Sequence, residues 1–110
     1  MNDAQFGKLV EYVKKNLITE VLLKKGAEYS RGNDRLSNFK RMAEIQGCTP
    51  EKALIGAWSK HLASILDMVD DLDGPVQSKT SKSHLAQWDE KIGDAINYLI
   101  LLRALIEERK

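Results

Sequence analysis

The chain has 110 residues, of which 43% are apolar, and its 17 basic and 16 acidic side chains leave a net charge of +1. This length fits one domain, residues 1–110, and a near-neutral charge gives little attraction to nucleic acids or membrane surfaces. The longest apolar run, Tyr98–Leu102, is too short to span a bilayer. The single cysteine, Cys48, excludes an internal disulfide and is typical of a reducing cytoplasm. We therefore expect a cytoplasmic protein whose partners are neither membranes nor nucleic acids.

Residues 3–24 are predicted to form the first helix, because apolar side chains recur through them at helical spacing. Asn2 or Asp3 can cap its start, since short polar side chains accept hydrogen bonds from the first free backbone amides. The stripe that we expect in the core consists of Phe6, Leu9, Val10, Val13, Leu17, Ile18, Val21 and Leu22.

Residues 25–34 interrupt this pattern with two glycines, a serine and an asparagine, which predicts a loop. Lys25, Arg31 and the following Arg35 are suited to phosphate, and Tyr29 is suited to stacking on a base. The run at 32–34 also fits a plain turn that caps the next helix. The sequence contains neither a P-loop nor a Gly-x-Gly-x-x-Gly motif, so the commonest nucleotide signatures are excluded.

Two further helices are predicted at residues 35–46 and from Pro50 to about Asp71. Gly47 is suited to end the first, and Thr49 followed by Pro50 is suited to begin the second. Their inner faces are predicted to hold Leu36, Phe39, Met42, Ala43 and Ile45, and then Leu54, Trp58, His61 or Leu62, Ile65, Met68 and Val69.

A polar line runs beside the apolar stripe of the third predicted helix. It places a cation, a hydroxyl and two carboxylates along one side, at Ala57, Lys60, Ser64, Asp67 and Asp71. His61 lies next to this line and has two interpretations, a partly buried structural histidine or a ligand contact.

The last helix, residues 88–106, follows a polar loop at 72–84 that is either a connector or a lid over a site. Its core stripe is predicted to be Trp88, Ile92, Ala95, Leu99, Leu102 and Ile106. A neighbouring face holds Glu90, Asp94, Asn97 and Leu101, with Gly93 between them. This face is either a ligand site or a solvated flank, in which case Gly93 marks a close helix crossing.

Four helices without strand-like alternation predict an all-α fold, an antiparallel helical bundle of about four helices. After Leu99, apolar residues nearly surround the last helix, which is more than one monomer of this size needs. We therefore expect a homo-oligomer.

Several of these residues resemble a family of small phage and bacterial proteins, the nucleotide modification associated domain. The resemblance covers about residues 24–106 and is carried by Glu28–Tyr29, Asp34–Lys40, Lys60–His61 with Asp67, and Glu90–Tyr98. The last helix is also similar to the second half of the MazG-like all-α nucleoside triphosphate pyrophosphohydrolases, in which a Glu and an Asp lie beside a Gly. That family holds Mg²⁺ with a further Glu-Glu-x-x-Glu cluster, which this chain lacks upstream of Glu90. Only Asp67, Asp70 and Asp71 are available as substitutes, at a different spacing.

Three functions follow. The first is capture of a phosphorylated nucleotide or nucleotide second messenger without cleavage and without a cofactor, as in an anti-defence protein of a phage. Basic groups outnumber carboxylates in its predicted ligand-binding set, which is Lys25, Tyr29, Arg31, Asn33, Asp34, Arg35, Asn38, Phe39, Lys60, His61, Ser64, Asp94 and Asn97.

The second function is a Mg²⁺-dependent nucleotide pyrophosphohydrolase or nucleotide-modification accessory enzyme. Its metal candidates are Asp67, Glu90 and Asp94, with Lys60 on phosphate. The third is a structural or partner-binding phage protein without a small ligand.

Overall fold

The computed structural model describes residues 1–29, 31–73 and 82–110, and at 25, 28, 29, 82 and 83 it describes the backbone alone. Within these ranges the chain is all-α, as predicted, with four α-helices and one isolated bridge between Arg31 and Asp34 in place of any strand. The elements are α1 (Asp3–Tyr12), the π-helix η1 (Val13–Lys25), the 3-10 helix η2 (Gly26–Tyr29), α2 (Ser37–Gln46), α3 (Pro50–Asp70), the 3-10 helix η3 (Asp71–Asp73) and α4 (Lys82–Glu108).

The helix ends follow from local chemistry at the positions that the sequence indicated. The Asn2 side chain accepts a hydrogen bond from the backbone amide of Gln5, and the Gln5 side chain accepts one from the backbone amide of Asn2. This reciprocal pair is a capping box. Gly47 ends α2 with a φ of 69°, a left-handed conformation that glycine adopts without steric cost. Thr49 accepts from the Lys52 amide and precedes Pro50 at the first position of α3.

The first predicted helix is one continuous rod that changes its winding at Val13, from α1 to the π-helix η1. A π-helix of 13 residues is unusual, because π-helical turns normally occur singly. The rod extends one residue beyond the predicted end, to Lys25. Most of its predicted stripe is not core: Phe6, Leu9 and Val10 are exposed, and Leu17 is the buried member.

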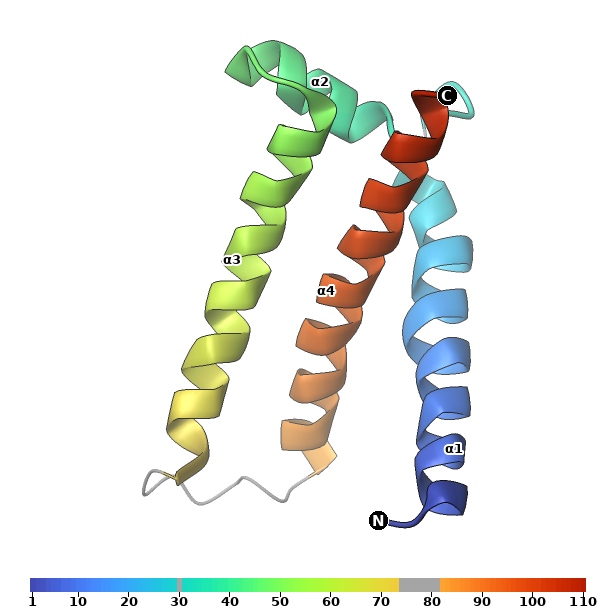
Figure 1. The fold of residues 1–110 in the computed structure, drawn as a ribbon, viewed down its shortest axis with the longest axis vertical. Coiled ribbons are helices and arrows are strands. Elements are labelled where there is room, and N and C mark those ends of the chain that lie inside the picture. Colours follow the sequence, from blue (N-terminus) through green and yellow to red (C-terminus); the bar gives the residue numbers. More distant parts are fainter. Residues whose placement is uncertain (30, 74–81) are drawn as a thin grey trace.

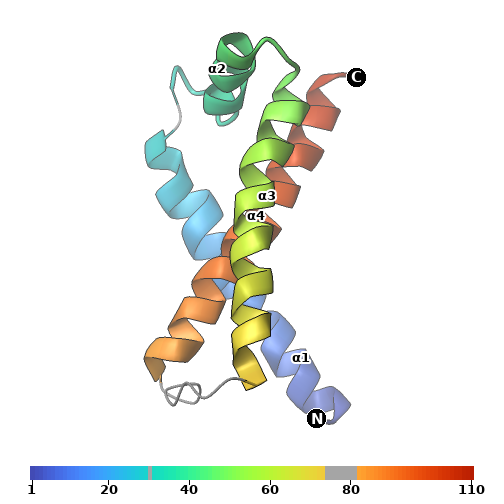
Figure 2. The ribbon, with the colours of Figure 1, turned by 90° about the vertical axis from the view of Figure 1, so that its left-hand side faces the viewer.

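The long helices lie side by side, with α2 across their upper ends (Figure 1). The chain descends α3 and returns along α4, so these two helices are antiparallel (Figure 1). The rod of α1 and η1 crosses α4 obliquely (Figure 2). At this crossing Gly93 is buried, and a Cβ added to it would lie 3.3 Å from the Leu17 Cβ. The close helix crossing predicted at Gly93 is therefore present.

The core lies at the end of the molecule where α2 meets α3 and α4. Its buried cluster is Leu36, Phe39, Leu54 and Leu105, with Tyr98 and Leu101 among the side chains packed against it. At the same end Arg109 donates two hydrogen bonds to the Glu51 carboxylate, at 2.6 and 2.8 Å, which ties the C-terminus to the start of α3.

Several residues predicted as core are exposed instead. On α4 the stripe prediction was wrong for Ile92, Leu99 and Ile106. The rod instead covers the face with Gly93 and Asn97, and Leu105 packs against Phe39 of α2 and Leu54 of α3. On α2 and α3 it was wrong for Ile45 and Val69, which no neighbouring helix covers.

Both predicted loops contain helical structure. Residues 26–29 form η2, and a turn closed by the Asp34 amide bonding to the Arg31 carbonyl follows. The loop predicted at 72–84 is shorter, because η3 continues to Asp73 and α4 begins at Lys82. Its residues 74–81, and with them the proposed lid, lie outside the described residues. Within the described chain, no helix is both long and apolar enough to cross a membrane.

Candidate functional site

A cavity of about 560 Å³ opens between the end of η1, the start of α2 and the middle of α4. Its volume falls in the range of about 300 to 1,000 Å³ that is typical of small-molecule sites. The cavity is lined by Val21, Leu22, Gly26, Arg35, Asn38, Phe39, Glu90, Asp94, Asn97, Tyr98 and Leu101.

The cavity brings together two groups of the predicted ligand residues that lie far apart in the sequence. Arg35 lies just before α2, Asn38 and Phe39 lie in its first turn, and Asp94 and Asn97 come from the middle of α4. They meet because the buried Phe39 packs edge-on against Tyr98, with ring centroids 5.8 Å apart. Core packing of α2 on α4 thus sets the distance between the two groups.

Asn97 holds the inner wall of the cavity. Its side-chain amide nitrogen donates to the Leu17 carbonyl at 2.8 Å, and only 6% of the residue is exposed. This bond fixes the orientation of the amide and leaves the buried Oδ1 without a hydrogen-bond partner in the described structure. A buried acceptor without a partner is uncommon and costs about 1 to 3 kcal/mol. This oxygen exposes less than 1 Å², so it belongs to the packed η1–α4 crossing.

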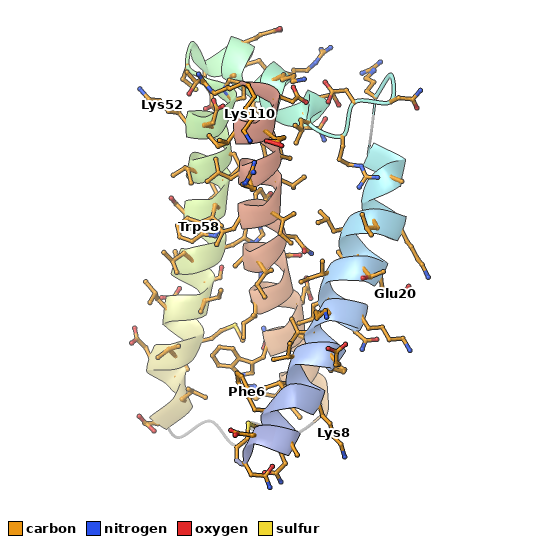
Figure 3. The ribbon with its side chains drawn as sticks, turned by 45° about the vertical axis from the view of Figure 1, so that its right-hand side comes forward. Phe6, Lys8, Glu20, Lys52, Trp58 and Lys110 are labelled. Carbon is orange, nitrogen blue, oxygen red and sulfur yellow. The ribbon has the colours of Figure 1, made fainter. Side chains whose placement is uncertain are left out.

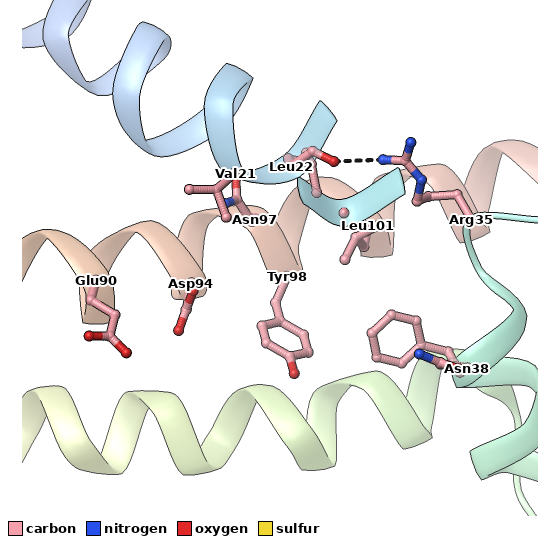
Figure 4. A pocket seen from close by; sticks show the side chains of 11 residues that line it. Val21, Leu22, Arg35, Asn38, Glu90, Asp94, Asn97, Tyr98 and Leu101 are labelled. Atoms are coloured by element: carbon pink, nitrogen blue, oxygen red, sulfur yellow. Dashed lines mark hydrogen bonds between the residues drawn. The ribbon is translucent and has the colours of Figure 1, made fainter. Parts of the chain in front are cut away.

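One end of the cavity is acidic. Glu90 and Asp94 are one helical turn apart on α4 and point to the same side of it (Figure 4). Burial raises the pKa of Asp94 above its usual value and nearby Glu90 adds to the increase, whereas His61 opposes it. The His61 Nδ1 lies 3.8 Å from the Asp94 carboxylate. A carboxylate held in an unfavourable environment beside a cavity is a frequent feature of binding and catalytic sites.

The other end is formed by Arg35, which is anchored and not free to move. Its Nη1 donates to the Leu22 carbonyl at 2.6 Å (Figure 4), and a Cβ on Gly26 would lie 3.4 Å from the same nitrogen. Arg35 therefore joins the end of η1 to the start of α2. Of the described lining side chains it is the one cation, so the basic excess expected of this site is not gathered in the cavity.

Lys60 and His61 lie in a second hollow of about 430 Å³ between α2, α3 and α4. Tyr98 borders both spaces, and its ring centroid is 4.8 Å from that of His61. Small residues keep the second hollow open, and its lining is Met42, Gln46, Ala53, Gly56, Ala57, Lys60, His61 and Tyr98.

The other predicted ligand residues of the turn and of α3 do not reach either space. Asp34 was predicted to bind ligand, but it accepts from the Leu36 amide and pairs with Lys40 at 2.6 Å, which lowers its pKa. Asp34 therefore stabilises the turn before α2, as in the second interpretation of that run, but it does not cap the helix, whose N-cap is Leu36. Arg31 and Asn33 are exposed on the same turn, and Ser64 is half-buried on α3. The side chains of Lys25 and Tyr29 lie outside the described residues.

The predicted metal set is not assembled either. Glu90 and Asp94 line the cavity, whereas Asp67 is exposed on α3 and lines neither hollow. The described residues contain no group of three or more His, Cys, Asp or Glu side chains arranged for a metal ion.

Val21 and Leu22 in the apolar wall were not predicted as part of a site, because in the sequence they are indistinguishable from core positions, whereas Leu101 lies on the α4 face that was predicted as a possible ligand site. Comparisons with protein-family models, curated proteins and solved structures find no match to this chain. The resemblance to the nucleotide modification associated domain therefore stays a prediction.

Proposed function

We propose that this protein binds a small nucleotide-type ligand in the cavity between η1, α2 and α4 and releases it unchanged. The observation that carries the proposal is a cavity of ligand size with the carboxylate acceptors of Glu90 and Asp94 toward one end and the Arg35 guanidinium toward the other (Figure 4). A nucleobase presents ring N–H or exocyclic amino groups that are suited to such acceptors.

The two ends of the cavity differ in charge in a way that suits a nucleotide. Glu90 and Asp94 accept hydrogen bonds and repel phosphate, so the base belongs at their end. Arg35 offers the positive charge that a phosphate needs, and its planar fork favours oxyanions. The Tyr98 ring lies between the two ends (Figure 4), where it supplies a flat apolar surface. Lys60, in the adjoining hollow, is a second contact for a longer phosphorylated ligand.

Capture without cleavage fits this chemistry better than hydrolysis does, because among the described residues two carboxylates line the cavity, those of Glu90 and Asp94. A protein of this kind sequesters its ligand by mass action. Together with the phage-type resemblance, this suggests that the chain withdraws a nucleotide second messenger of host defence in the cytoplasm. It would need no cofactor for that task.

The test is a panel of nucleotides, including cyclic dinucleotides and ADP-ribose derivatives, with and without Mg²⁺. Binding should raise the melting temperature, because a ligand that binds only the folded state stabilises it. After heat denaturation the ligand should be recovered intact. Absence of a shift with every nucleotide would refute the proposal.

A pair of variants locates the site. Val21→Trp fills the cavity from η1 and should abolish the shift, whereas Leu23→Trp alters an exposed position two residues along the same helix and should keep it. Equal shifts in both variants would place the ligand elsewhere.

The second candidate is the Mg²⁺-dependent pyrophosphohydrolase, and the pair of Glu90 and Asp94 on one face of α4 favours it. It requires further carboxylates from outside the described set. If it is right, the panel will show a nucleotide consumed only with Mg²⁺, and Asp94→Asn will abolish turnover while binding largely remains. Turnover unaffected by Asp94→Asn would exclude this metal role.

We also infer that the helices complete an antiparallel bundle only as a homo-oligomer. The apolar side chains exposed on α1, α3 and α4 support this, because one protomer leaves them without cover. A structural or partner-binding role remains the third candidate, and a negative nucleotide panel would favour it.

A further inference from the structure

The side of α4 that faces away from the cavity carries one apolar residue every seven positions. These residues are Leu85, Ile92, Leu99 and Ile106, and they are exposed by 58%, 39%, 46% and 45%. Trp88, Ala95 and Leu102 follow each of the first three at a spacing of three and are partly covered. Apolar residues at alternating spacings of three and four form the heptad pattern through which helices pair in coiled coils. We call this line of residues, from Leu85 to Ile106, the α4 seam. Leu102 packs against the buried cluster, whereas the four residues at the spacing of seven stay exposed in the protomer.

The flank of α3 adds to the same surface. Ile55, Leu66 and Val69 are exposed on α3, on the side opposite to Ala57 and Lys60, which border the second hollow. Both hollows lie on one side of the α3–α4 pair, because they share Tyr98. The exposed apolar residues of α3 and α4 therefore face the other side together. At the lower end Phe6 lies on the side of α1 toward α3 and α4, whereas Lys8 points away (Figure 3).

The protomer exposes more surface than a compact monomer of its mass. A monomer of 12.4 kDa is expected to expose about 6,100 Å², whereas this protomer exposes 8056 Å². Its radius of gyration of 16.3 Å likewise exceeds the value of about 13 Å expected for a chain of this length. The surplus of about 1,900 Å² is more than the roughly 800 Å² per partner that a standard interface needs.

Two charges beside the seam indicate what covers it and in which direction. Asp89 and Arg103 each lie four residues after a seam residue and at equal distances from Ile96. In the protomer Asp89 also accepts a hydrogen bond from Tyr12 of α1 and borders the η1 crossing, so in the pairing below it serves both partners. If a second α4 runs antiparallel about a two-fold axis near Ile96, each Asp89 lies opposite the partner's Arg103. In a parallel pair the two charges would be about 21 Å apart along the helices.

We propose that a second copy of this chain docks antiparallel along the α4 seam, forming a two-fold dimer through α3 and α4. Both cavities lie on the outer sides of this dimer and remain open. The interface therefore does not depend on the proposed nucleotide binding, and either inference can fail alone.

The first experiment measures molar mass by light scattering and by sedimentation equilibrium at tens of micromolar protein. The wild-type chain should show twice the mass of the 12.4 kDa protomer. Leu99→Glu places a charge in the centre of the seam and should yield monomers, whereas Ile45→Glu, at an exposed apolar position on α2, should remain dimeric. Circular dichroism verifies that both variants are folded. A monomeric wild type, a larger assembly, or a dimeric Leu99→Glu would overturn the proposal.

The second experiment tests the orientation by charge exchange. Arg103→Glu sets like charges opposite each other and should weaken the dimer at least tenfold. Asp89→Lys should weaken it too, and it also removes the acceptor of the Tyr12 hydroxyl, so Tyr12→Phe is its control. The double variant Asp89→Lys with Arg103→Glu should recover most of the wild-type dissociation constant. A double variant weaker than both single variants would exclude the antiparallel pairing.

Discussion

The two faces of α4 differ in how far the protomer covers them. The face toward the cavity carries Gly93, Asp94, Asn97 and Leu105, a set with few apolar side chains, yet the rod, α2 and α3 cover much of it. The opposite face carries a regular line of large apolar side chains and stays open in the protomer. An apolar stripe on a helix therefore indicates that something covers it, but not whether the cover is the same chain or another one.

On the covered face, a glycine allows the two helix backbones to approach closely, and an amide side chain joins them by a hydrogen bond. Gly93 removes the side chain at the crossing, and Asn97 bonds to the Leu17 carbonyl on the other helix. That bond joins residues 80 positions apart and fixes how the two helices lie along each other. An apolar residue at 97 would pack there without specifying the register.

Truncating one leucine on each face gives the largest expected contrast. Leu105→Ala should lower the free energy of unfolding by about 3 kcal/mol at every protein concentration, because it leaves a cavity in the buried cluster. Leu99→Ala should cost about 0.5 kcal/mol in the monomer and progressively more as concentration favours the dimer. Urea titrations over a hundredfold range of protein concentration measure both effects. Equal, concentration-independent losses would contradict the assignment of the two faces.

The sequence predicted this fold well where local chemistry decides. Asn2, Gly47 and Thr49 mark helix ends by bonds within a few residues, and they do so in the structure. It failed on Ile92 and Leu99 because burial depends on which helix arrives from elsewhere in the chain.

The candidate site was predictable in its polar half only. Asp94 and Asn97 stood out on α4, and Arg35 and Asn38 stood out after the loop, because polar groups beside apolar stripes are conspicuous. Lys60 and His61 could not be assigned to a second hollow, since that depends on where Tyr98 stands between the two spaces. The bonds that occupy Asp34 likewise appear only once the turn is folded.

Enlarging the glycine at the helix crossing should have an intermediate effect. Gly93→Leu must push η1 away, since the Cβ alone would be 3.3 Å from the Leu17 Cβ. We expect a loss of about 1 to 3 kcal/mol from overpacking, despite the gain of about 1 kcal/mol in helix propensity. Gly7→Leu on α1, where nothing lies within 4 Å, is the matched control and should be neutral or stabilising. If both variants melt alike, the crossing is not closely packed in solution.

The smallest expected effect concerns Asp94 and has a definite sign with pH. Because its pKa is raised in the folded state, chiefly by burial, folding favours the protonated acid. This contribution to stability is complete below the unfolded value of about 3.8 and is lost as pH rises through the folded pKa. Asp94→Asn should therefore be slightly more stable than wild type at neutral pH, although 36% exposure of the side chain keeps the gain small.

The melting temperatures of wild type and Asp94→Asn from pH 3 to pH 8 measure this difference. The control for the change in net charge is Asp67→Asn, which removes an exposed carboxylate from α3. If Asp94→Asn stabilises the protein and also weakens nucleotide binding, the carboxylate lowers stability but serves the ligand. Such a trade-off between stability and function is typical of binding sites. A variant that is less stable than wild type across the whole range would instead make Asp94 a structural residue, paired with His61.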